Sequence, residues 1–164
     1  MGLRNYILSY DTYCAVVVAI FMLLALPAQV SVDFAKDIFA VGISVLSIIF
    51  GIFFAALAFI ISATDNEFVK LLEEKKYFTS LIKSFEVTLG SLFIAMIFAI
   101  FFYAYTSLKA SNGEKLLGKL WIIFFFFLFS YSLVATLLAT RDAIRFSKYR
   151  IKFMDILSKD KKKD

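Results

Sequence analysis

The residue types that perform chemistry inside membrane proteins are nearly missing from the apolar parts of this sequence. The chain has no histidine and one cysteine, Cys14, which excludes an internal disulfide and disfavours a transition-metal site. Asp11 and Glu86 are acidic residues next to apolar segments, and we expect both to lie at a membrane boundary. Phosphate-binding, dinucleotide-binding and nucleophile–base motifs do not occur. We therefore predict a protein that is not an enzyme, with no catalytic, cofactor-binding or metal site.

Small residues at helical spacing are the clearest candidates for function. Six of them recur every three or four residues along one helical face, and we call them the 44–62 strip: Ser44, Ser47, Gly51, Ala55, Ala58 and Ser62. A second set, the 88–99 strip, consists of Thr88, Ser91, Ala95 and Ala99. Small residues let membrane helices approach closely, and hydroxyl groups can bond across the contact. Either the strips pack against each other within one chain, or one of them faces a second copy or lines a narrow pore.

Polar residues beyond the apolar segments form a second group of candidates, for contact with lipid or with a cytoplasmic protein. Thr64 and Glu67 have the spacing of a capping box, which starts a helix. Four basic residues follow at helical spacing and form one basic face: Arg141, Arg145, Lys148 and Lys152. This face either rests on anionic lipid headgroups or docks an acidic soluble protein.

Membrane-spanning helices must position all of these residues. Four apolar runs contain no Asp, Glu, Lys, Arg or His, and about 20 apolar residues cross the hydrocarbon core. With 62% hydrophobic and 19% charged residues, the sequence lacks the charged faces of a soluble bundle. We predict an all-α polytopic membrane protein whose four transmembrane helices form two hairpins with short cytoplasmic helical extensions.

The predicted boundaries follow from the apolar runs and the residues that interrupt them. The first span is interrupted by Pro27 and Gln29, and it reaches full length only if it starts near Tyr6. The hairpins are expected to turn through Ser31–Asp37 and Ala110–Gly118. The four-helix domain occupies residues 1–140. Within and after it we expect spans at 6–30, 38–62, 87–108 and 120–140, a helical elbow at 64–85, a basic helix at 141–158 and a charged tail at 159–164.

Lysine and arginine counts predict the orientation. Fourteen of these residues fall on the side that holds both termini and the second loop, and four fall on the other side. Basic residues stay on the cytoplasmic side, so both termini are expected there. The net charge of +5 is explained by attraction to anionic headgroups, without direct nucleic-acid binding.

The stretch from Ser47 to Tyr105 has a recognisable character. It joins a span rich in small residues to the sequence Ile-Ser-Ala-Thr-Asp-Asn-Glu-Phe at 61–68, and then to an elbow and another apolar span. This stretch resembles small four-span membrane proteins encoded in bacterial anti-phage defence operons, such as the membrane component of the Kiwa system. The resemblance implies a homo-oligomer of the bacterial inner membrane, such as a tetramer. It also implies a separate soluble, nucleic-acid-binding subunit and a response to infection at the membrane.

Three functions are therefore open. The chain is a defence-system subunit that senses or acts at the inner membrane with a cytoplasmic partner, or it is a small oligomeric channel that depolarises the cell, or it is a scaffold that transports nothing. The small-residue strips favour self-association in all three cases.

Overall fold

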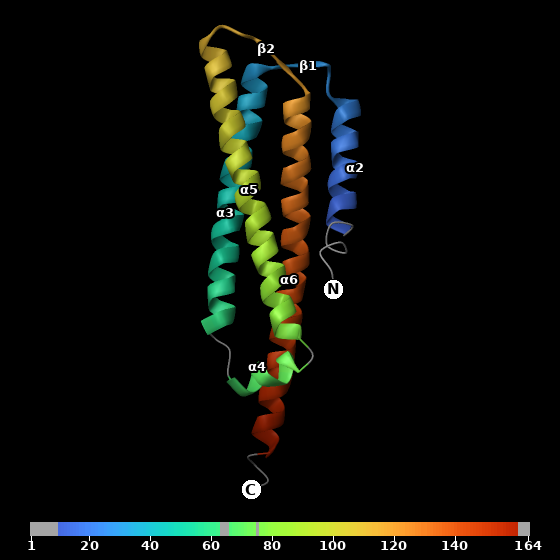
Figure 1. Cartoon of the computed structure of the whole chain (residues 1–164), viewed down its shortest axis with the longest axis vertical. Coiled ribbons are helices and arrows are strands. Elements are labelled where there is room, and N and C mark those ends of the chain that lie inside the picture. The colour runs from blue at the N-terminus through green and yellow to red at the C-terminus, as the bar shows by residue number, and fades with distance from the viewer. Residues whose placement is uncertain (1–9, 63–65, 75, 161–164) are drawn as a thin grey trace.

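The computed structural model describes residues 10–62, 66–74 and 76–160. Within these residues, five helices and two short strands form an elongated arrangement (Figure 1). In chain order they are α2 (Tyr10–Ala25), β1 (Gln29–Ser31), α3 (Val32–Ser62), α4 (Asn66–Glu73), α5 (Tyr77–Ser111), β2 (Leu116–Gly118) and α6 (Leu120–Asp160).

Three of these helices, α3, α5 and α6, are long and apolar enough to cross a membrane. The fourth apolar helix, α2, has 16 residues in the described part, and these rise about 24 Å, less than the roughly 30 Å of a hydrocarbon core. It ends at Ala25, five residues before the predicted end of the first span. Pro27 explains the early end, since proline disfavours helical geometry in the residue before it and cannot donate a backbone hydrogen bond. The predicted start near Tyr6 lies outside the described residues.

The start of α3 differs from the predicted turn through Ser31–Asp37, because the helix begins at Val32. Ser31 acts as its N-cap, and the Ser31 hydroxyl accepts a hydrogen bond from the Phe34 N–H at 3.2 Å. Asp33 in the first turn adds a favourable charge at the positive end of the helix.

The two loops at the α2–α3 and α5–α6 connections are joined by a small sheet that the all-α prediction did not contain. Strands β1 and β2 pair antiparallel, with Val30 opposite Leu117 at the centre. Both central side chains are buried. The Lys119 ammonium group extends the junction by donating to the Leu23 carbonyl at the end of α2, at 2.9 Å. We call β1, β2 and Lys119 the clasp.

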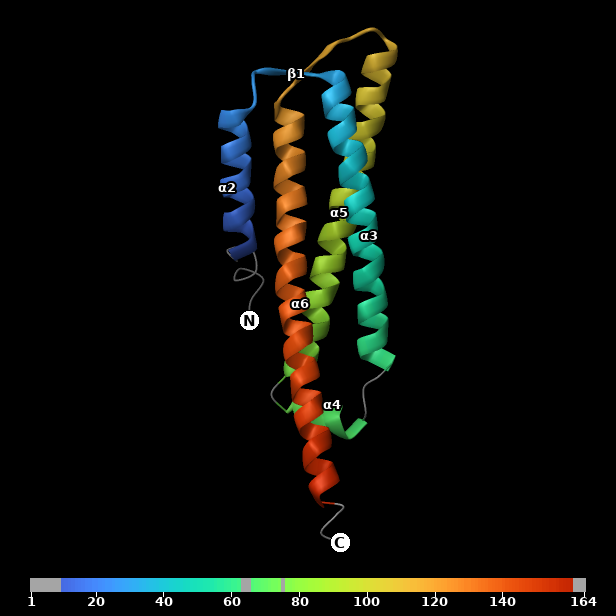
Figure 2. The same ribbon diagram turned by 180° about the vertical axis from the view of Figure 1, so that it is seen from behind.

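The helices form a row with α6 between α2 and the other two long helices (Figures 1 and 2). The closest packing joins α3 to α5, α2 to α6 and α5 to α6. α5 and α6 therefore pack together, whereas α2 packs along α6 and not along α3, its partner in the first predicted hairpin. The clasp accounts for this difference, because it ties the end of α2 to the start of α6.

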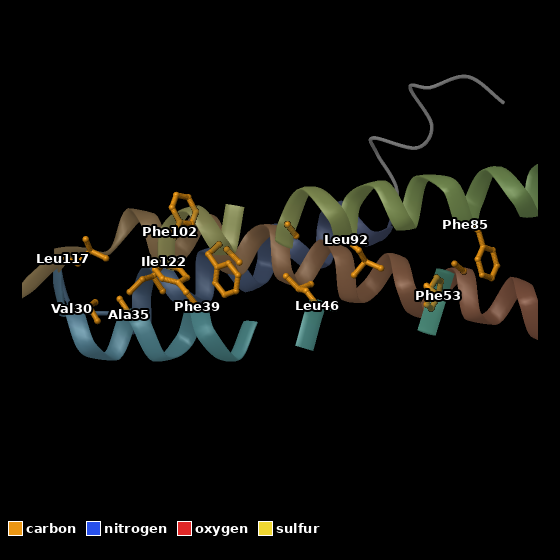
Figure 3. Close-up of a cluster of buried hydrophobic side chains, with 14 of the residues drawn as sticks. Val30, Ala35, Phe39, Leu46, Phe53, Phe85, Leu92, Phe102, Leu117 and Ile122 are labelled. Atoms are coloured by element: carbon orange, nitrogen blue, oxygen red, sulfur yellow. The ribbon is translucent and has the colours of Figure 1, made fainter. Parts of the chain in front are cut away.

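Aromatic rings fill the core where α3, α5 and α6 meet (Figure 3). The ring of Phe39 lies 5.6 Å from that of Phe102 and 5.2 Å, edge-on, from that of Phe125, counted between centroids. Gly42 permits this contact, because a Cβ atom at Gly42 would overlap the Phe125 ring. The overlapping atoms lie at the end of the Phe125 ring, which is buried and surrounded by other aromatic rings, so the ring has little room to move aside.

Replacing Gly42 by alanine should therefore destabilise the fold, by about 1–3 kcal/mol for overpacking. Gly90 is the matched control, since a Cβ atom there meets nothing within 4 Å and alanine favours the helix. Thermal unfolding in detergent should show a lower midpoint for Gly42→Ala and an unchanged or higher midpoint for Gly90→Ala. Equal midpoints for the two variants would mean that α3 and α6 do not meet at Gly42.

Candidate interaction surfaces

The 44–62 strip lies on the outside of the molecule. All six of its side chains are exposed, whereas Leu46, Phe53 and Ile60 on another face of α3 are buried against the rest of the chain. A Cβ atom at Gly51 would meet nothing within 4 Å. Intramolecular packing uses this strip at Ser47, whose hydroxyl group lies 3.3 Å from the Met96 sulfur of α5, and the other five residues remain exposed.

The hydroxyl groups of the 44–62 strip are already satisfied within α3. Ser44, Ser47 and Ser62 donate to backbone carbonyls of the preceding turn, at 3.0, 2.7 and 3.1 Å. A surface of small residues whose hydroxyl groups are bonded can be covered by another helix without leaving a buried donor unpaired.

The 88–99 strip lies on the inside. Thr88, Ala95 and Ala99 are buried, and Ser91 is partly buried. The Ser132 hydroxyl of α6 donates to the Ser91 carbonyl at 3.2 Å, which joins α5 and α6 directly. The two strips thus have similar compositions, but the 44–62 strip is exposed and the 88–99 strip is largely buried.

The described part of the elbow lies at the far end of the molecule from the clasp, where α4 crosses α6 (Figures 1 and 2). The Phe68 side chain of α4 is 1% exposed, and its ring lies 5.5 Å from that of Phe146 and 5.3 Å from that of Phe153, counted between centroids. Phe146 and Phe153 are seven residues apart and share one face of α6. This aromatic contact fixes α4 against residues 141–160 of α6, which we call the extension of α6.

The turn between α4 and α5 is held by Glu73. Its carboxylate accepts hydrogen bonds from the Thr79 hydroxyl at 2.6 Å and from the Thr79 N–H at 3.2 Å. Lys76 adopts a left-handed backbone conformation, with φ 55°. Of the predicted capping box, Thr64 lies outside the described residues, and the side chain of Glu67 is not described.

The basic face continues along a straight helix. Arg141, Arg145, Lys148 and Lys152 are all exposed on α6, which runs unbroken from Leu120 to Asp160. Arg145 makes a loose ion pair with Asp142 at 3.7 Å. Because α6 is unbroken past Thr140, we expect the basic segment to project away from the membrane instead of lying along its surface.

Two cavities lie between the elbow and α6, and they share Leu72, Tyr77 and Tyr149. The inner cavity, of about 320 Å³, is lined by Leu72, Tyr77, Ser80, Leu81, Asp142, Arg145, Phe146 and Tyr149. The outer cavity, of about 610 Å³, is lined by Phe68, Leu72, Glu74, Tyr77, Tyr149, Lys152, Phe153 and Ile156. Within the described part of the chain, no group of three or more acidic, cysteine or histidine side chains could hold a metal ion.

Comparisons with protein-family models, with curated proteins and with solved structures give no match to this chain. The surfaces must therefore be interpreted from their own chemistry. Sequence reasoning missed the clasp and the contact of Phe68 with α6. The seven-residue spacing of Phe146 and Phe153, on a helix otherwise rich in charge, was the available signal for the second.

Proposed function

We propose that the chain is a homo-oligomeric subunit of a bacterial anti-phage defence system, which senses or acts at the inner membrane together with a soluble cytoplasmic protein. The resemblance of the Ser47–Tyr105 stretch supports the biological role. The exposed 44–62 strip is the observation that supports self-association, and the elbow with the extension of α6 supports a partner.

The contrast between faces of α3 is the main argument for self-association. Elsewhere on its exposed surface α3 carries bulky side chains, among them Val41, Ile48, Ile52, Phe54 and Phe59. Lipid chains accommodate such side chains readily. Small residues in a continuous line instead favour close approach of a second helix, because association in lipid depends on packing. The helix that covers the strip is a second copy of α3, because every other subunit carries the same small-residue face.

Orientation and number of spans belong to the same proposal. Both termini and the elbow lie in the cytoplasm, supported by the asymmetry of fourteen basic residues to four. The segment that contains α2 is the fourth span, and the clasp lies on the outer side.

Replacing Gly51 by leucine should weaken assembly without disturbing the subunit, since the site is empty in the single chain. Ala55→Leu should act in the same way. Gly90→Leu is the control, because Gly90 is equally exposed but lies on α5, away from the strip. Native gels or mass measurements in detergent should show smaller particles for the two strip variants only. Equal particle stability in all three variants would contradict assembly through the strip.

A pore is the second candidate function, and one observation favours it. Asp33 and Asp37 are exposed and continue the line of the 44–62 strip toward the clasp, at spacings of four and seven residues. Around a symmetry axis they would form a ring of carboxylates at one mouth of a pore, which attracts cations. Potassium flux from liposomes that contain the protein separates this function from a scaffold, which would give no flux.

The outer cavity and its basic surroundings are suited to an acidic protein. Counted from Thr140 at about 1.5 Å per residue, Lys152 lies about 18 Å beyond the end of the apolar run. This exceeds the screening length of about 8 Å at physiological salt, so attraction to headgroups is weak there. The cavity is lined by apolar side chains, such as Phe153 and Ile156, by Lys152 and by one acidic residue, Glu74. An acidic segment with one or two apolar anchors complements it.

Reversing two charges, Lys148→Glu with Lys152→Glu, should reduce recovery of the cytoplasmic partner from cells by tenfold or more, and added salt should reduce wild-type recovery as well. The control is Lys83→Glu with Arg141→Glu, which reverses two exposed charges nearer the membrane. Arg145 is left unchanged because it lines the inner cavity. Undiminished recovery with the Lys148/Lys152 variant would place the partner elsewhere.

A further inference from the structure

We propose that the inner cavity binds the headgroup of an anionic phospholipid from the cytoplasmic leaflet, with phosphatidylglycerol as the best-matched chemistry. The proposal rests on α5 and α6 spanning the membrane with the elbow in the cytoplasm. It does not depend on self-association, on a protein partner or on the defence role.

The depth of the inner cavity is the first argument. Asp142 and Arg145 follow the end of the apolar run at Thr140 by about 3 and 8 Å along α6. On α5, Leu81 precedes the start of the run at Val87 by about 9 Å. The headgroup layer of a bilayer is about 5–8 Å thick on each side. The part of the inner cavity lined by Leu81, Asp142 and Arg145 therefore lies at the level of the lipid phosphates, whereas Lys152, Phe153 and Ile156 of the outer cavity lie beyond them.

The polar groups of the cavity match the headgroup. The Arg145 guanidinium group and the hydroxyl groups of Ser80, Tyr77 and Tyr149 are donors, as a phosphodiester requires. Asp142 is the one acidic side chain in the lining. Its carboxylate would repel a bare phosphate, but it can accept a hydrogen bond from a headgroup hydroxyl. The terminal glycerol of phosphatidylglycerol supplies such hydroxyl groups, next to its own phosphate.

The ion pair between Arg145 and Asp142 leaves both groups available. Its 3.7 Å separation is too long for a strong hydrogen bond, and the two side chains are 57% and 43% exposed. A headgroup could therefore bind to both without breaking a tight contact. Leu81 and Phe146 provide the apolar side of the cavity, where the acyl chains would leave toward the bilayer.

The cavity is built by the elbow and not by α6 alone. The rings of Phe78 and Phe146 lie 6.2 Å apart, and those of Tyr77 and Tyr149 lie 6.4 Å apart, which holds the start of α5 beside α6. Four of the lining residues come from the elbow and α5, and four come from α6. The cavity is thus two-sided, with its one basic side chain, Arg145, on α6 and hydroxyl groups on both sides, at the level where anionic headgroups lie.

The test measures thermal unfolding of the purified full chain in detergent, with three additions compared: phosphatidylglycerol, phosphatidylcholine and soluble glycerol phosphate. Phosphatidylglycerol alone should raise the midpoint of the wild-type protein, by about 5 °C near saturation. Arg145→Ala should abolish the rise. Arg141→Ala is the matched control, because Arg141 is an exposed arginine one turn away that does not line the cavity, and it should keep the rise.

Two further variants distinguish a loss of lipid binding from a folding defect. Arg145→Lys keeps the charge and should keep part of the rise. With phosphatidic acid as a further addition, Asp142→Asn should reduce the preference for phosphatidylglycerol over phosphatidic acid.

Several results would overturn the proposal. An equal loss in the Arg141→Ala and Arg145→Ala variants would show general attraction to charge. An equal effect of glycerol phosphate would show a site for free phosphate. A separate measurement with an acidic peptide completes the test: a rise with this peptide and none with phosphatidylglycerol would assign the cavity to a protein.

Discussion

The pairing of β1 with β2 is the constraint on which the arrangement of the helices depends. Three residues on each strand join the two loops, with Val30 and Leu117 buried at the centre and Lys119 tied to the end of α2. The clasp places the starts of α3 and α6 next to each other. Further from the clasp, the contact of Gly42 with the Phe125 ring joins the same two helices again. Because α2 is held on the far side of α6, the helices form a row and do not close into a four-helix bundle.

A row of helices leaves surfaces that a closed bundle would bury, and the 44–62 strip is one of them. The 88–99 strip, similar in composition, is turned toward the inside of the molecule, and the Ser132 hydroxyl of α6 donates to the Ser91 carbonyl within it. We infer that the exposed strip serves the same purpose between subunits. At the other end, α6 and the elbow are joined through Phe68, which creates cavities at two depths. The proposed functions divide accordingly: contact between copies within the membrane, and contact with lipid and protein at the cytoplasmic surface.

The sequence predicts the parts of this fold that depend on local pattern. Long apolar runs without charge indicate α3, α5 and α6, and the basic spacing after Thr140 indicates that α6 continues. The start of α3 at Val32 was missed although Ser31 followed by Asp33 is a recognisable cap. The clasp could not be predicted, since two three-residue strands carry no periodic signal and their pairing is a long-range event. Which strip faces inward was equally hidden, because both have small residues at the same spacing and only the global arrangement distinguishes them.

Cross-linking between copies in intact membranes tests the central claim most directly. In a Cys14→Ala background, Gly51→Cys places one thiol in the middle of the 44–62 strip, and Gly90→Cys places one on an exposed site of α5. A disulfide requires Cα atoms within about 7 Å, so only closely packed copies can form it. Oxidation should yield a dimer, at twice the 18.7 kDa chain mass, with Gly51→Cys and little with Gly90→Cys. Equal dimer formation by the two variants, or none by Gly51→Cys, would contradict the account that copies of α3 meet through the strip.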